Sequence, residues 1–229
     1  MTRRLCAVFA HPDDESFGPA GTLARYAEEG VEITLVTATS GEAGEVHNVP
    51  TAPENLAALR ERELREAMNA LGVQDIRLLH LPDGRLADRM DDLYQAVVGA
   101  LREIRPQVII TEDIQGITGH PDHIAVTQTV VRAFDDLTGS PVKLYEHVLP
   151  RSTAPGHVAS TPDDYITARL NVEAWRPRII AALAAHRSQV SDEFLEARRA
   201  GPGPWINHYV CVRSRVPILI PEEDLFAGL

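Results

Sequence analysis

Residues 6–18 read CAVFAHPDDESFG and join an apolar run to a dense cluster of polar groups. The run at 6–10 has the composition of a buried strand, and it stops abruptly at His11. One imidazole and three carboxylates then occur within five residues, 11–15. Because burying unpaired carboxylates is costly, this cluster at the end of a buried strand indicates a site where something compensates their charge.

Segments typical of strands and helices alternate along the rest of the chain. The segment 53–72 has leucines at helical spacing, a proline near its start and a glycine at its end, which predicts a helix. Strands are predicted at 4–10, 31–39, 76–81, 107–111, 142–149 and 207–213, and further helices at 15–29, 90–104, 123–134 and 178–186. This order predicts an α/β fold with a Rossmann-like, mostly parallel sheet and helices on both faces.

A single domain over residues 1–229 is the simplest organisation, with a core at about 4–190 and a C-terminal strand and tail at 205–229. The segments 150–165 and 200–205 are rich in proline, glycine, serine and threonine, so we expect loops or lids there. The apolar stretch 216–226 is expected to pack on its own domain, which leaves a homo-oligomer as the alternative.

Composition limits the classes of partner. The hydrophobic content of 44% and charged content of 24% are ordinary for a globular protein, and the net charge of −11 argues against nucleic acid or an anionic membrane as partners. No apolar run is long enough to span a membrane, and the N-terminal apolar run is too short for a signal peptide. Cys6 and Cys211 are expected to be reduced, buried thiols. We therefore expect a cytoplasmic protein.

A second His/Asp cluster resembles the first. Residues 120–123 read HPDH, residues 11–14 read HPDD, and each cluster comes after a predicted strand. Ligands of open parallel sheets bind beyond the carboxyl ends of the strands, so we expect the two clusters to meet there. Two histidines and one carboxylate suit a catalytic zinc with open positions, and a second carboxylate could act as the base. Either cluster alone could instead be a turn or a helix cap.

With these residues in view, the chain resembles the PIG-L/LmbE-like family of zinc-dependent N-acetylglucosaminyl deacetylases. The resemblance rests on AHPDDESFGPAGTLARYAEEG (10–30), VTATSGEAGE (36–45), LRERELREAMNALGV (59–73), LPDG (81–84), TGHPDH (118–123) and AALAAHRSQ (181–189). The pair of AHPDDE with GHPDH is specific, whereas the other blocks are individually weak. All of them occur in the family's order over about residues 4–190.

The resemblance implies a role for each matching position. The family's metal ligands fall on His11, Asp14 and His123, its general base falls on Asp13, and the histidine that stabilises the oxyanion falls on His120. The implied reaction is attack of a zinc-activated water on the amide of an N-acetylated sugar or glycoconjugate, which gives acetate and a free amine. Zinc is the expected cofactor, although ferrous iron or another divalent ion would suit the same ligands.

Three further positions are expected to contact substrate: Arg60, Asp83 and Glu42. Each has a plainer alternative, since Arg60 could pair with glutamates along its helix, Asp83 could shape a turn, and Glu42 could hold its loop together. His186 is interpreted as a contact at the end of a helix rather than a catalytic group. Among the histidines without motif support, His47 is the one expected to touch a ligand.

Two other functions remain open at this point. A metal-dependent amidase acting on a non-sugar acyl amine would use the same metal site and differ only in the variable loops. A non-catalytic α/β ligand-binding module should carry a G-x-G-x-x-G turn after the first strand, but the chain has FGPAGTL at 17–23. The substrate itself is not predicted by the sequence.

Overall fold

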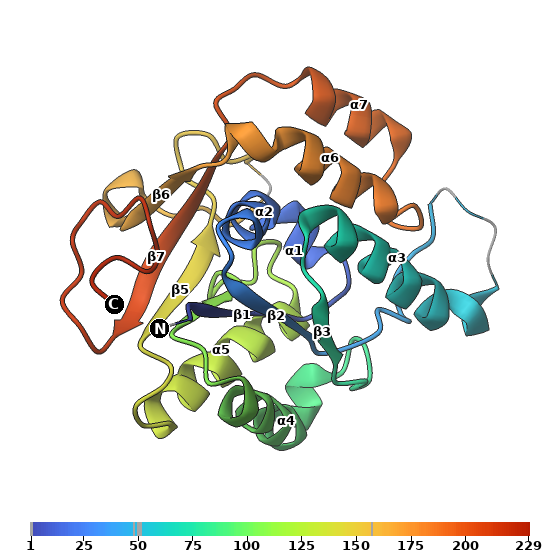
Figure 1. Cartoon of the computed structure of the whole chain (residues 1–229). Coiled ribbons are helices and arrows are strands. Elements are labelled where there is room, and N and C mark those ends of the chain that lie inside the picture. The colour runs from blue at the N-terminus through green and yellow to red at the C-terminus, as the bar shows by residue number, and fades with distance from the viewer. Residues whose placement is uncertain (1, 48, 50–51, 157) are drawn as a thin grey trace.

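Seven strands form one mixed sheet in the computed structural model, which describes residues 2–47, 49, 52–156 and 158–229 (Figure 1). The strand order is β3-β2-β1-β4-β5-β7-β6. The five strands from β3 to β5 are mutually parallel, and β7 is antiparallel to both β5 and β6. Only β7 therefore runs against the others, which confirms the mostly parallel α/β sheet. The strands are β1 (Arg4–Phe9), β2 (Glu32–Thr37), β3 (Asp75–Leu78), β4 (Val108–Thr111), β5 (Lys143–Val148), β6 (Ala168–Asn171) and β7 (Ile206–Ser214).

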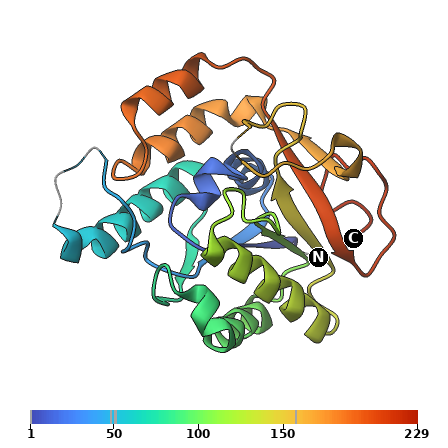
Figure 2. The same ribbon diagram turned by 180° about the vertical axis from the view of Figure 1, so that it is seen from behind.

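Helices cover both faces of this sheet (Figures 1 and 2). Helices α2, α3 and α6 pack on one face, α4 and α5 pack on the other, and α7 lies outside α6. The helices are α1 (Asp14–Phe17), α2 (Ala20–Glu28), α3 (Leu56–Leu71), α4 (Met90–Ile104), α5 (Pro121–Asp136), α6 (Arg176–Ala185) and α7 (Asp192–Ala200). Short 3-10 helices occur at Pro53–Asn55, Leu86–Arg89, Asp163–Tyr165 and Glu173–Trp175.

The central strand β1 supplies both cores. Leu5 and Phe9 belong to the hydrophobic cluster under α2, α3 and α6, whereas Cys6 and Val8 belong to the cluster under α4 and α5. Alternate residues of a strand point to opposite faces, so a strand buried on both faces is a continuous apolar run. This is why residues 5–10 are all apolar, and the first polar side chain after them is His11, beyond the end of the strand.

Three elements differ from the sequence-based expectation. The helix expected at 15–29 is divided into α1 and α2 by Gly18 and Pro19, and the proline has no N–H to continue the helical ladder. Strand β6 and helix α7 were not predicted. Strand β6 is only four residues long, and α7 buries only Leu195, so neither has a strong periodic pattern.

The C-terminal tail packs on the domain through a buried cluster of polar groups. The Lys143 ammonium donates to the Glu222 carboxylate at 2.5 Å, and the Tyr145 hydroxyl donates to the other oxygen of Glu222. Leu225 and Phe226 are buried beside them, so this end of the stretch 216–226 packs on its own domain as expected, whereas Leu219 and Ile220 are 73% and 62% exposed. Both cysteines are free thiols, with Cys6 buried and Cys211 only half-buried.

Candidate active site

The chain reverses its order across the sheet between β1 and β4, and the first candidate residues lie at this point. From β1 the chain builds outward to β2 and β3, whereas β4 and β5 extend the sheet on the other side. Crevices for ligands form where the strand order reverses, beyond the carboxyl ends of the strands. His11 lies just beyond the end of β1, Glu112 directly follows β4, and α5 brings the HPDH segment to the same edge.

The three predicted metal ligands face one another. His11 Nδ1 is 3.2 Å from His123 Nε2 and 3.7 Å from Asp14 Oδ2, and His123 Nε2 is 3.4 Å from Asp14 Oδ1. Ligand atoms about 2.0–2.1 Å from a zinc ion at tetrahedral angles lie roughly 3.3 Å apart. Burial lowers the pKa of His123, which favours the neutral imidazole that a metal requires. These donor types and separations suit a metal ion, and two overlapping groups of possible ligands meet at His123, one with His11 and His120 and one with Asp14 and Glu112.

Asp13 is held in a strained conformation beside these residues. Its φ of 112° and ψ of −26° lie where residues with a side chain are rare, at a cost of about 1–3 kcal/mol. The Arg60 guanidinium donates to Asp13 Oδ2 at 3.1 Å, to the Gly41 carbonyl at 2.8 Å and to the Pro12 carbonyl. Burial raises the pKa of Asp13 to about 7, with Asp14 adding to the effect and Arg60 opposing it.

His120 directly precedes α5 and lies against both metal-facing histidines. Its ring centroid is 4.9 Å from that of His11 and 5.0 Å from that of His123. As the N-cap residue, it accepts the backbone N–H of Asp122 on Nδ1 at 3.2 Å. An imidazole nitrogen that accepts a hydrogen bond carries no proton, so the ring proton of neutral His120 is on Nε2.

Two carboxylates hold the far side of the His11 ring. His11 Nε2 is 2.9 Å from Asp83 Oδ1 and 3.4 Å from Asp122 Oδ2. Burial alone would lower the pKa of His11, but its hydrogen bonds to Asp122 and Asp83 raise it to about 10, so a metal that binds Nδ1 has to displace a proton from this ring. The fully buried Asp122 also accepts the backbone N–H groups of Gly84 and Leu86, at 2.7 and 3.0 Å. Carboxylates placed in this way fix the orientation of a metal-binding histidine.

Sequence reasoning missed Asp122 and Glu112. Asp122 lies between the two histidines of HPDH, and Glu112 directly follows a buried strand. Both positions could therefore have been predicted as site residues, the first from the motif and the second from its place at a strand end. Glu112 Oε2 and His123 Nδ1 are 3.4 Å apart, and both atoms are buried without a hydrogen-bond partner among the described residues. Burial and the nearby Asp14 raise the pKa of Glu112 well above its usual range.

The other predicted residues lie at different depths around this centre. Glu42 is exposed, and its carboxylate accepts the Asp83 N–H at 3.0 Å, so it joins the loops after β2 and β3. Arg60 is buried against the loop that carries Asp13, not paired with glutamates along its own helix. His47 is exposed in the loop that follows β2. His186 is fully buried and bonded to Glu15, so it is more than a contact at a helix end.

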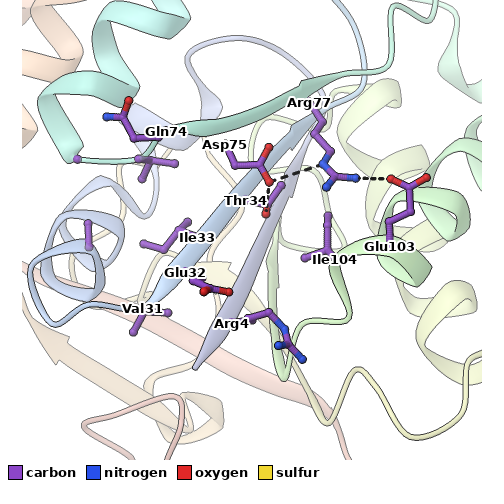
Figure 3. A pocket seen from close by; sticks show the side chains of 13 residues that line it. Arg4, Val31, Glu32, Ile33, Thr34, Gln74, Asp75, Arg77, Glu103 and Ile104 are labelled. Atoms are coloured by element: carbon purple, nitrogen blue, oxygen red, sulfur yellow. Dashed lines mark hydrogen bonds and ion pairs between the residues drawn. The ribbon is translucent and has the colours of Figure 1, made fainter. Parts of the chain in front are cut away.

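A hollow lies at the end of the sheet opposite to the candidate site. A cavity of about 510 Å³ opens where β2 and β3 begin, away from His11 (Figure 3). Three of its charged side chains pair with one another: Arg77 Nη1 lies 2.8 Å from Glu103 and Arg77 Nε lies 3.7 Å from Asp75, which in turn accepts the Thr34 hydroxyl. This hollow holds none of the predicted site residues.

Comparison with known proteins shows the family to which this chain belongs. Residues 6–134 match the family described as PIG-L, GlcNAc-PI de-N-acetylase. The chain belongs to the PIG-L family. Family members remove the acetyl group from N-acetylglucosamine-type substrates and depend on a metal, which confirms the prediction of a metal-dependent deacetylase. Among the described residues, no helix is both long and apolar enough to cross a membrane.

Similar proteins cover nearly all of the chain. A 1D-myo-inositol 2-acetamido-2-deoxy-alpha-D-glucopyranoside deacetylase from Acidothermus cellulolyticus is 34% identical over 100% of this chain and 96% of its own length. The deacetylase 2 of the same name from Saccharopolyspora erythraea is 38% identical over 97% of this chain and 99% of its own. The crystal structure of the conserved protein TT1542 from Thermus thermophilus is 28% identical, with a TM-score of 0.69 over 94% of this chain and 96% of that one.

Proposed function

We propose that this PIG-L family deacetylase uses zinc and acts on a 2-acetamido-2-deoxyglucopyranosyl group carried by a small polar alcohol. The observation that carries the metal proposal is the mutual spacing of His11, Asp14 and His123, at 3.2 to 3.7 Å. The two relatives at 34% and 38% identity are named for an inositol-linked sugar of this class. Such a glycoside is therefore the first substrate to test.

His11 and His123 would hold the zinc ion as imidazoles, and Asp14 would hold it as a carboxylate. When bound, zinc supplies a Lewis acid that polarises the amide carbonyl and lowers the pKa of a water molecule. Asp83 and Asp122 keep the His11 ring in place by accepting at Nε2, which leaves Nδ1 directed at the metal position. Ferrous iron is the alternative, because imidazole and carboxylate ligands bind both ions.

Asp13 is proposed as the general base that takes the proton of the attacking water. A base works best when its pKa lies near the working pH, and the pKa of about 7 for Asp13 meets that condition. Arg60 holds Oδ2 of Asp13, so the other oxygen of this carboxyl remains available for the proton. The resulting carboxylic acid is a donor close to the leaving amine.

His120 is proposed to stabilise the oxyanion through a hydrogen bond, while the proton for the departing amine comes from the Asp13 carboxylic acid. Its Nδ1 accepts a backbone hydrogen bond, so Nε2 carries the proton that can be donated. A fixed donor directed at developing negative charge typically contributes about 10²–10³ in kcat. The N-cap position fixes the ring because Pro121 and the first turn of α5 determine the backbone at this residue.

The sugar is proposed to meet Glu42, Asp83 and Arg60 on the loops around the metal position. Glu42 and Asp83 are joined by two hydrogen bonds between their loops, from Asp83 N–H to Glu42 and from Ala43 N–H to Asp83. The exposed Glu42 carboxylate offers acceptors for sugar hydroxyls at the rim, whereas the Asp83 side chain is only 6% exposed and would meet the sugar beside His11. Arg60 lies deeper, where it would act on the substrate beside Asp13.

We also infer that the protein works in the cytoplasm. The support is its pair of free thiols, Cys6 and Cys211, since exported proteins commonly oxidise their cysteines to disulfides. Fractionation of cells that produce the protein would test this inference.

The decisive experiment measures metal content and amine release on the same purified protein. We expect near-stoichiometric zinc or iron, release of amine from an inositol-linked N-acetylglucosaminide, and loss of that release after chelation. Restored activity after addition of zinc but not ferrous iron would identify zinc as the functional metal. Protein that binds neither ion after reconstitution would overturn the proposal, and metal without release from any N-acetylglucosaminide would overturn the substrate class.

A further inference from the structure

A buried ionic pair lies directly behind the loop that carries Asp13. His186 Nε2 is 2.8 Å from Glu15 Oε1, and both side chains are completely shielded from solvent. The Ser16 hydroxyl donates to the same carboxylate oxygen at 2.6 Å. Because neither Glu15 nor His186 reaches the surface of the site, neither can touch a substrate.

The second oxygen of Glu15 is bonded to the main chain of the proposed base. Glu15 Oε2 accepts the backbone N–H of Asp13 at 3.0 Å. Asp13 has a φ of 112°, a conformation that persists only where the surroundings enforce it. Glu15 holds the main chain of Asp13 on one side, and Arg60 holds its side chain on the other.

The turn that carries His186 also fixes the helix that carries Arg60. Two residues after His186, the Ser188 N–H and hydroxyl donate to the Glu63 carboxylate at 3.0 and 2.6 Å. Glu63 lies on α3, one turn after Arg60. The turn after α6 therefore contacts both Glu15, which bonds to the main chain of Asp13, and helix α3, whose Arg60 bonds to the Asp13 side chain.

We infer that Glu15 and His186 are positioning residues, which fix the backbone of Asp13 so that its carboxyl is directed at the attacking water. This inference rests on the proposed function of Asp13. In this way the AHRSQ block at 185–189 affects the reaction by positioning Asp13, although none of its side chains lies at the metal position. A misplacement of about 1 Å at a reacting group can cost roughly 10²-fold in rate.

The chain contains a matched control for a purely structural role. Lys143 and Glu222 form another ionic pair with side chains only 0% and 1% exposed. Lys143 is the first residue of β5 and pairs with the start of β4, so it lies at the end of the sheet opposite to the candidate site. Removing this charge pair should lower stability without moving Asp13.

The test compares Glu15→Leu, His186→Leu, His186→Gln and Glu222→Gln for kcat, KM, zinc content and Tm. For Glu15→Leu and His186→Leu we expect kcat to fall about 10- to 100-fold, with KM within about twofold and zinc content unchanged. His186→Gln retains an amide N–H that can donate to Glu15 and should recover most of kcat. Glu222→Gln should lower Tm and leave kcat unchanged.

A crystal structure of Glu15→Leu adds a readout that does not depend on turnover. We expect Asp13 to leave its positive φ in this variant, because leucine has no acceptor for the Asp13 N–H. If Asp13 keeps its conformation and the variants lower Tm without lowering kcat, as in Glu222→Gln, the positioning role is wrong. Failure of the wild type to release amine would instead reject the proposed function, and the Asp13 conformation would still decide the positioning role.

Discussion

Replacing His147 with glutamine should remove a large part of the protein's sensitivity to mild acid. His147 lies on β5, is 8% exposed and packs against Tyr209 with ring centroids 5.5 Å apart. Burial, with a smaller effect of His208, lowers the pKa of His147 to about 4, from the ordinary value of 6.5. The folded protein therefore keeps this imidazole neutral at pH values where an unfolded chain would protonate it.

The sign and size of the effect follow from linkage. When folding lowers the pKa of a histidine, the free energy of unfolding has its full value above pH 6.5, where the ring is neutral in both states. This free energy then falls as the pH falls toward 4, because the unfolded chain takes up the proton more readily than the folded one. Each pH unit between the two pKa values corresponds to about 1.4 kcal/mol, so the full effect approaches about 3 kcal/mol. In His147→Gln this loss is absent, because glutamine does not titrate.

Urea unfolding followed by circular dichroism from pH 7.5 to pH 4.5 would measure the effect. Over this range the wild type should lose roughly 2–3 kcal/mol more unfolding free energy than His147→Gln. The exposed His47, changed to glutamine, controls for the loss of any histidine. Parallel curves for the wild type and His147→Gln would refute the reasoning, since they would mean that His147 titrates equally in the folded and unfolded states.

Three further predictions concern the site and the tail. Asp13→Ala should retain zinc and lose about 10²–10⁴ in kcat, whereas Asp14→Ala should lose zinc affinity; equal metal content in both would reject this division of roles. His120→Ala should lower kcat by about 10²–10³ with zinc content unchanged, and an unaltered kcat would remove His120 from the reaction. Lys143→Met leaves Glu222 buried without its partner, so unfolding in urea should show a loss of about 3–5 kcal/mol; a loss below about 1 kcal/mol would contradict this account of the tail.

Much of the fold was predictable because its signals are local. In α3 the buried Leu56, Leu64, Met68 and Leu71 recur at helical spacing, and Gly72 ends the helix with a φ of 83°. The parallel sheet followed from the alternation of such segments. Strand β6 is different, because its four residues are a strand only through pairing with β7, which lies 35 residues later in the chain.

Only those residues of the candidate site that lie in motifs at strand ends were predictable from the sequence. The sequence placed His11, Asp14 and His123 together because both clusters come after parallel strands. It did not predict that Asp83 would turn toward His11, since a Pro-Asp-Gly turn has the same sequence whichever way its carboxylate points. The burial of His186 depends on Glu15, which is 171 residues distant in the chain, and no local pattern encodes that contact.

The position of β7 has a consequence for how the protein is made. Strand β7 comes last of the seven in chain order and lies between β5 and β6, so β5 has an open edge and β6 lacks its neighbouring strand until residues 206–214 emerge from the ribosome. Open strand edges are templates for pairing with other chains, so a nascent protein in this state is prone to aggregate. All residues proposed to take part in the chemistry lie at or before His123 in the chain. A ribosome that stalls before β7 would therefore release a chain that carries all of them and is still a target for chaperones and proteases.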